Sequence, residues 1–166
     1  MIYERKQKED PVSFFHFTTD PIDGPCVYKR LKGCGVGTEY CAVTPAGDIY
    51  PCHQLVGETR FRMGNVQKVA LLLDEQRNRR FKRHVDEILD ATVRQQFADR
   101  LITKNEACLS CFARYHCGGG CMANAYHATG SLDGRYELGC ELARKRLECA
   151  LWLAVALRRN NRDMLQ

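Results

Sequence analysis

Apolar residues recur at spacings of three and four along the second half of the chain, the pattern of helices with one buried face. One such series predicts a single long helix across residues 81–101. Its members are Phe81, Val85, Ile88, Leu89, Val93, Phe97 and Leu101. A second series predicts a helix over residues 136–160, and the segment 69–76 before both predicts a shorter helix or a turn. The second helix is expected to bury the stripe Leu138, Leu142, Leu147, Leu151 and Val155.

β-Branched and aromatic residues predict strands in the first half of the chain. Residues 38–53, TEYCAVTPAGDIYPCH, predict a β-hairpin that turns at PAGD and leaves Cys52 just past its second strand. Residues 12–17, VSFFHF, predict a short strand followed by a turn-rich loop. Because this strand has no partner close in sequence, residues 1–33 are interpreted as the end of a larger domain. Strands followed by helices give the fold class α+β.

Composition indicates one soluble globular domain, because 166 residues carry 45% hydrophobic and 27% charged side chains. The first ten residues are charged and no signal peptide follows them. The longest apolar run, at 150–157, is too short to span a bilayer, so no membrane partner is expected. The net charge is +5, and basic residues concentrate at 77–84, RNRRFKRH. No nucleic-acid-binding motif accompanies this segment. We interpret this segment as a solvated helix face and expect no nucleic-acid partner.

Ten cysteines change this ordinary picture. Without an export signal the protein is expected in the cytoplasm, where dense cysteine patterns more often bind metal or catalyse than form disulfides. The densest run is CLSCFARYHCGGGC at 108–121, spaced C-x2-C-x5-C-x3-C. A single zinc ion takes four ligands, fewer than the chain offers, and four cysteines are also the usual ligands of a [4Fe–4S] cluster. Glycines 118–120 would let backbone amides approach cluster sulfides, although they would also serve a plain tight turn.

The order of these cysteines resembles the signature of the SPASM domain, a C-terminal extension of radical S-adenosylmethionine enzymes. That signature is C-x(9–15)-G-x4-C, then C-x2-C-x5-C-x3-C, then a final C. Here Cys34, Gly47 and Cys52 open the pattern, the run 108–121 follows, and Cys140 closes it. Within this family, the sequences of residues 24–66 and 111–150 resemble those of the maturases of SCIFF peptides.

The resemblance implies a SPASM or twitch-like fold, in which a small β-hairpin and helices wrap around two [4Fe–4S] clusters. The implied domains are a barrel remnant and linker at 1–33, the SPASM domain at 34–158, and a polar tail at 159–166. The implied ligands of the first cluster are Cys34, Cys52 and Cys121. Those of the second cluster are Cys108, Cys111, Cys117 and Cys140.

The first cluster then lacks a fourth protein ligand. Either the upstream Cys26 closes the site, or one iron stays open to bind the substrate. Cys41 and Cys149 are expected to be packed thiols, because free cysteine behaves as a small hydrophobe. His53 is expected to be a surface or packed histidine rather than a hydrogen-bond donor to the cluster. Three aromatic residues are expected to shield the clusters from water, namely Tyr50, Phe112 and Tyr115.

The function implied by the resemblance is the maturation of a cysteine-rich ribosomal peptide through thioether crosslinks. The motif C-x3-C-x2-C that binds S-adenosylmethionine is absent, since Asn124 stands where the run from Cys117 would need its third cysteine. S-Adenosylmethionine would therefore bind to a radical barrel supplied in cis or by a separate chain. Alone, the chain is expected to bind peptide rather than to act as an enzyme. The alternatives are a zinc-stabilised interaction domain and a stand-alone, ferredoxin-like electron-transfer module.

Overall fold

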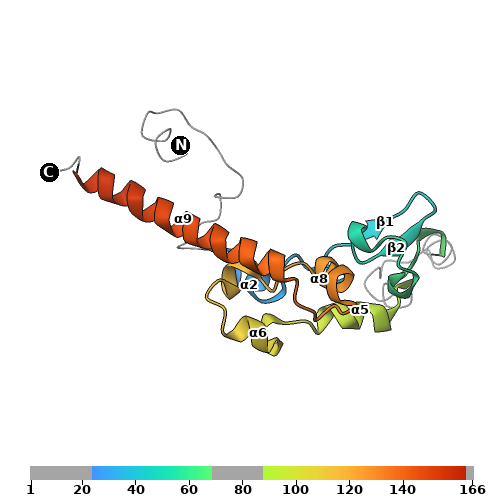
Figure 1. Ribbon diagram of the computed structural model, residues 1–166. Coiled ribbons are helices and arrows are strands. Elements are labelled where there is room, and N and C mark those ends of the chain that lie inside the picture. The colour runs from blue at the N-terminus through green and yellow to red at the C-terminus, as the bar shows by residue number, and fades with distance from the viewer. Residues whose placement is uncertain (1–23, 69–87, 164–166) are drawn as a thin grey trace.

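Helices and a small antiparallel sheet share one hydrophobic core in the computed structural model, which describes residues 24–68 and 88–163 (Figure 1). This confirms the predicted α+β class. The strand expected at 12–17, the helix or turn at 69–76 and the basic segment 77–84 lie outside the described residues. No helix in the described ranges is long and apolar enough to cross a membrane.

The sheet has three short strands in the order β1-β2-β3. Strands β1 (Ala42–Val43) and β2 (Asp48–Tyr50) form the predicted hairpin, with Val43 opposite Ile49. The third strand, β3 (Gly64–Asn65), pairs with β2 and was not predicted. Two residues are too few to show an alternating pattern. Gly64 is needed there because a Cβ atom would lie 2.6 Å from the carbonyl oxygen of Ile88.

The prediction of one long helix over 81–101 is wrong for residues 88–101, the part of it that the structure describes. The chain is helical at Ile88, bends at Leu89, and begins a separate helix, α5 (Ala91–Ala98). Asp90 caps α5, because its Oδ1 atom accepts hydrogen bonds from the backbone N–H of Thr92 and of Val93 at 2.9 and 3.0 Å. A capping aspartate of this kind stabilises a helix start, and here it outweighs the continuous apolar spacing. The residues Phe81 and Val85 lie outside the described ranges.

The C-terminal helix α9 (Glu137–Asp163) confirms the second predicted helix and continues past its predicted end at residue 160. Its predicted stripe is wrong, since Leu147 is 6% exposed whereas four other members are between 42% and 58% exposed. Those four are Leu138, Leu142, Leu151 and Val155. The distal half of α9 extends beyond the other described elements (Figure 1). Only the turns around Leu147 and Ala150 therefore become buried against the body.

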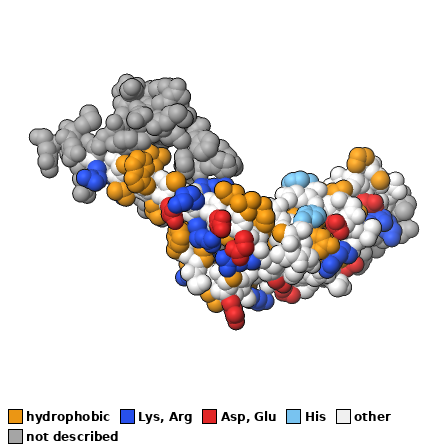
Figure 2. Space-filling model, viewed as in Figure 1, with side chains coloured by type: hydrophobic (Ala, Val, Ile, Leu, Met, Phe, Trp, Pro, Cys, Tyr) orange, Lys and Arg blue, Asp and Glu red, His pale blue; other side chains and the backbone are white. Residues whose placement is uncertain are grey.

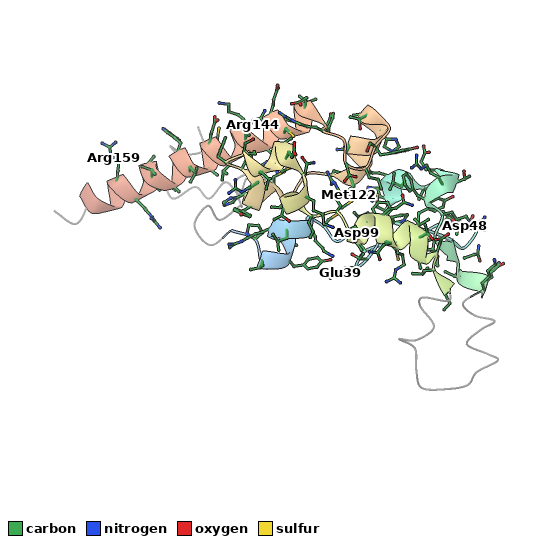
Figure 3. The ribbon with its side chains drawn as sticks, turned by 90° about the horizontal axis from the view of Figure 1, so that it is seen from below. Glu39, Asp48, Asp99, Met122, Arg144 and Arg159 are labelled. Atoms are coloured by element: carbon green, nitrogen blue, oxygen red, sulfur yellow. The ribbon has the colours of Figure 1, made fainter. Side chains whose placement is uncertain are left out.

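The core is built around Phe61, which is fully buried. The rings of Phe97 and Tyr126 meet it edge to face, at centroid distances of 5.7 and 4.9 Å. Phe61 ends the 3-10 helix η3 (Thr59–Phe61), and Leu55, also fully buried, ends η2 (His53–Leu55). Met122 joins this core from the first position of α8 (Met122–Thr129), where Figure 3 labels it. Because Cys52 precedes η2 and Cys121 precedes α8, the core fixes two of the predicted ligands.

Four short helices surround the cysteine run: α2 (Val27–Lys32), η4 (Ile102–Lys104), α6 (Glu106–Leu109) and α7 (Arg114–Cys117). Helix α2 was not predicted; it lies against α7. The contact is close at Gly118, where a Cβ atom would lie 2.4 Å from the carbonyl oxygen of Lys29. Glycine is therefore required at this position for α2 and α7 to meet.

Candidate metal centre

A cavity of about 560 Å³ opens between α6, α7 and α9. Five of the predicted ligands line it, namely Cys108, Cys111, Cys117, Cys121 and Cys140. Helix α6 carries Cys108, α7 ends at Cys117, and the first turn of α9 presents Cys140. All of these except Cys121 are the cysteines that the resemblance assigns to the second cluster.

The thiols of this cavity lie close enough to influence one another. Burial raises the pKa of the Cys117 thiol above its usual value, and the charges of Cys140 and Cys111 raise it further. The backbone N–H groups of Gly120 and Gly119 act in the opposite direction, because they hydrogen-bond to the sulfur of Cys117. Donors of this kind stabilise a thiolate, which is the form that binds metal.

A second group forms around Cys52, which is 6% exposed. Burial raises the pKa of its thiol, the backbone N–H groups of Gln54 and Leu55 lower it, and the charges of Cys121 and Cys34 raise it. The side-chain amide of Gln54 also donates to Sγ of Cys121 across 3.8 Å. The cysteines acting on Cys52 are thus the two that the resemblance assigns to the same cluster.

The glycines between Cys117 and Cys121 separate the two groups. Gly118, Gly119 and Gly120 have φ angles of +67°, +90° and +75°, which side-chain-bearing residues rarely adopt. The chain reverses through them, so that Cys117 faces the cavity while Cys121 acts on Cys52. Cys121 also touches the cavity wall and therefore lies at the boundary of the two groups.

The donor set fits a polynuclear cluster. Among the described residues, no group of three or more His, Cys, Asp or Glu side chains converges as the ligands of a single ion. The cysteines of the cavity instead line a volume of about 560 Å³. A [4Fe–4S] cluster needs this arrangement, because each of its irons takes one thiolate.

The remaining cysteines are more exposed than the sequence suggested. Cys26 is exposed immediately before α2, and it is not among the groups that act on Cys52. The prediction that Cys41 is a packed thiol is wrong, because Cys41 is exposed at the edge of β1. Edge strands of two residues have little to pack against. Cys149 is half-buried on α9.

The aromatic residues and the histidine predicted to lie near the clusters also differ in their exposure. Tyr50 is buried at 5% exposure, as expected of a shielding aromatic residue. Phe112 and Tyr115 are 56% and 43% exposed, so their predicted shielding role is not seen in the described chain. His53 is an exposed histidine whose Nδ1 atom hydrogen-bonds the Tyr40 hydroxyl at 2.9 Å, in line with the surface interpretation.

Sequence reasoning missed two residues in the cavity wall. The side chain of Arg100 is 10% exposed, and its Nη2 atom donates to the carbonyl oxygen of Gly119 at 3.1 Å. The Nε2 atom of His116 is buried and lacks a hydrogen-bond partner within the described chain. No short-range pattern could have revealed Arg100, because its partner is nineteen residues away.

Comparison with known proteins matches part of the chain to an iron–sulfur domain. Residues 34–112 match the family model of SPASM, an iron–sulfur cluster-binding domain. The mycofactocin maturases MftC of Mycobacterium ulcerans and Mycobacterium tuberculosis are 30% identical to the chain over 122 residues. That region covers 74% of the chain but 28% and 27% of the relatives, so the chain spans just over a quarter of their length. The relative from Mycolicibacterium smegmatis is 28% identical over the same extent.

Proposed function

We propose that this chain, whose residues 34–112 match the SPASM iron–sulfur domain, is the cluster-carrying portion of a radical S-adenosylmethionine enzyme that modifies a peptide. The similarity to proteins named mycofactocin maturases supports a peptide substrate. The narrower proposal is a cysteine-rich peptide joined by thioethers, as in SCIFF maturation. S-Adenosylmethionine and the radical barrel would come from another part of the same protein or from a second chain in the cytoplasm.

The observation that carries the proposal is the division of seven cysteines into two groups. Cys52 is acted on by Cys121 and Cys34, whereas Cys117 and Cys108 are both acted on by Cys140 and Cys111. Cys121 follows Cys117 by only four residues, yet the two cysteines act in different groups. This supports two [4Fe–4S] clusters with crossed ligation, the second held by Cys108, Cys111, Cys117 and Cys140.

When bound, such clusters supply one-electron chemistry or an open iron for a substrate ligand. The chain's own residues hold the thiolates and shield them. Gly119 and Gly120 direct N–H groups at the sulfur of Cys117, and Gln54 and Leu55 do the same at Cys52. Hydrogen bonds to sulfur and exclusion of water are the means by which a protein adjusts a cluster.

Metal and sulfide analysis tests the number and kind of clusters. After anaerobic reconstitution the protein should hold about eight irons and eight sulfides, because two four-cysteine sites each take a four-iron cluster. Stoichiometric zinc without sulfide would instead support the zinc-stabilised interaction domain. Full clusters in a chain that binds neither a radical barrel nor a peptide would support a ferredoxin-like module.

Paired variants test the crossed ligation. Cys140→Ala should remove about half of the iron by emptying the second site, and Cys121→Ala should remove the other half. Their difference spectra should therefore be distinct, although Cys121 lies in the same short run as Cys108. Cys41→Ala is the matched control, because Cys41 is exposed and belongs to neither group. Identical spectral losses in the two ligand variants would reject the crossed assignment.

The fourth ligand of the first cluster needs its own test. We propose that a substrate thiolate occupies that iron, since thiolates are good iron ligands. Cys26→Ala should then retain both clusters, and a cysteine-containing peptide should perturb the paramagnetic spectrum of the first cluster. A peptide with Ser in place of Cys should perturb it far less. Loss of the first cluster in Cys26→Ala would assign Cys26 as the ligand instead.

A further inference from the structure

We propose that Arg100 makes the second cluster easier to reduce than the first. The inference rests on the proposed function, because it concerns the cluster assigned to Cys108, Cys111, Cys117 and Cys140. It assigns Arg100 a role in setting a reduction potential, and it gives the two otherwise similar sites an order of electron uptake.

The side chain of Arg100 is held firmly at the cavity wall. It follows Asp99, which ends α5 and is labelled in Figure 3. Its guanidinium is bound on one side to the carbonyl oxygen of Gly119 at 3.1 Å and on the other to Asp133 at 3.7 Å. Since only 10% of the side chain is exposed, the positive charge is fixed beside the cysteines rather than free in solvent.

The charge of Arg100 acts on the second site. Arg100 and Cys108 lie together in the wall of the cavity, and both also line a smaller pocket beside it, so the guanidinium is close to this predicted ligand. Asp133 compensates little of this charge, because 82% of its side chain is exposed to water. A buried cation next to the cluster position therefore stabilises added negative charge more strongly than an exposed cation would.

Of the ligands predicted for the first site, Cys34 and Cys52 do not line the cavity that holds Arg100, and Cys121 lies at its boundary. The sulfur of Cys52 receives neutral backbone donors from Gln54 and Leu55, and Cys121 receives the neutral amide of Gln54. Reduction adds one electron from a low-potential one-electron donor, and no bond forms or breaks. The site beside a fixed cation gains more from this added charge than the site beside neutral donors.

Arg135 provides a matched comparison at the same cavity. Its guanidinium lies in hydrogen-bonding range of the Cys140 side chain, but it pairs with Glu137 at 2.7 Å and is 44% exposed. Partner and solvent both screen its charge, so its effect should be small. Arg159, labelled at the distal end of α9 in Figure 3, is exposed and far from the cavity.

The test is a potentiometric titration of the reconstituted protein with dithionite, followed by paramagnetic resonance. The signal that Cys140→Ala removes identifies the second cluster. Arg100→Gln should shift the midpoint of that cluster to more negative potential and leave the first cluster unchanged. Arg100→Lys should retain most of the wild-type midpoint, because it keeps the charge. Arg135→Gln should cause a smaller shift, and Arg159→Gln should cause none.

Three outcomes separate the possible failures. Full iron content in Arg100→Gln with an unchanged midpoint, or an equal shift at both clusters, would overturn the inference. Absence of sulfide in the wild-type protein would overturn the proposed function itself. If Arg100→Gln fails to hold clusters, the wild-type titration in 1 M KCl decides, since salt screens exposed charges but not a buried one. The gap between the two midpoints should persist, and its collapse would refute a buried-charge origin.

Discussion

Substitution of the first glycine in the cysteine run should destabilise the protein more than substitution of the third. Gly118 and Gly120 have similar positive φ angles of +67° and +75°. A Cβ atom at Gly118 would lie 2.4 Å from the carbonyl oxygen of Lys29 and 2.9 Å from the Cα atom of Gly33. A Cβ atom at Gly120 would meet nothing within 4 Å. The two alanine variants therefore differ in steric clash and share their backbone strain.

The shared terms cancel in the comparison. Each variant pays about 1–2 kcal/mol for a non-glycine residue in the left-handed region. Each gains about 0.4–1 kcal/mol from a less flexible unfolded chain. Gly118→Ala additionally forces two backbone segments apart, and overpacking of this kind costs about 1–3 kcal/mol. The expected difference in stability between the variants is this last amount. It corresponds to roughly 2–4 °C of melting temperature per kcal/mol for a chain of this length.

Thermal unfolding of the anaerobic, cluster-loaded protein measures this difference. The apparent midpoint should be followed by far-ultraviolet circular dichroism at one scan rate, with iron content checked before each scan. Gly118→Ala should melt at the lowest temperature and Gly120→Ala between it and the parent protein. Equal midpoints, or a lower midpoint for Gly120→Ala, would show that α2 does not rest against the glycine run as described.

Two further predictions follow from burial. Phe97→Ala should lower the free energy of unfolding by about 3–5 kcal/mol, because Phe97 is 2% exposed and packs on Phe61. The control Val43→Ala should change it little, because Val43 is 53% exposed. Urea titration measures both variants, and equal losses of stability would contradict the core assignment. In metal-free protein, alkylation of Cys117 should reach half of its maximal rate above pH 9.0, because burial raises its pKa above that ordinary value. The stability contributed by the neutral thiol is present below pH 9.0 and is lost as pH rises through the folded-state pKa, so the melting temperature should fall in alkaline solution. Half-maximal alkylation below pH 9.0 would refute the buried position.

The hairpin and the cysteine register could be read from sequence because each has a local signature. Pro45 and Gly47 mark a turn between β-forming residues, and the cysteine spacing resembles the signature of SPASM, whose family model matches residues 34–112. The prediction of one continuous helix through Leu89 was wrong because the apolar spacing continues across the point where Asp90 caps the start of a separate helix, α5. In the sequence, a single capping residue is a weaker signal than the periodic apolar spacing on both sides of it.

Other features depended on tertiary contacts that no local pattern reports. The apolar spacing of α9 predicts a buried stripe, but burial requires a second surface, and the described chain supplies one only near Leu147. Arg100 was overlooked because an arginine at a helix end is ordinarily solvated, whereas here the distant Gly119 carbonyl and Asp133 hold it in the cavity wall. The grouping of Cys34 with Cys52 came from the family pattern, not from spacing alone.

The projecting half of α9 carries the single tryptophan of the chain, Trp152, which is 63% exposed. Apolar side chains gather on this part of the helix in the space-filling view, with charged side chains concentrated nearer the body (Figure 2). The intrinsic tryptophan fluorescence of the protein therefore reports on the surroundings of α9 and not on the core around Phe61. A blue shift on mixing with another protein would identify a surface that covers α9.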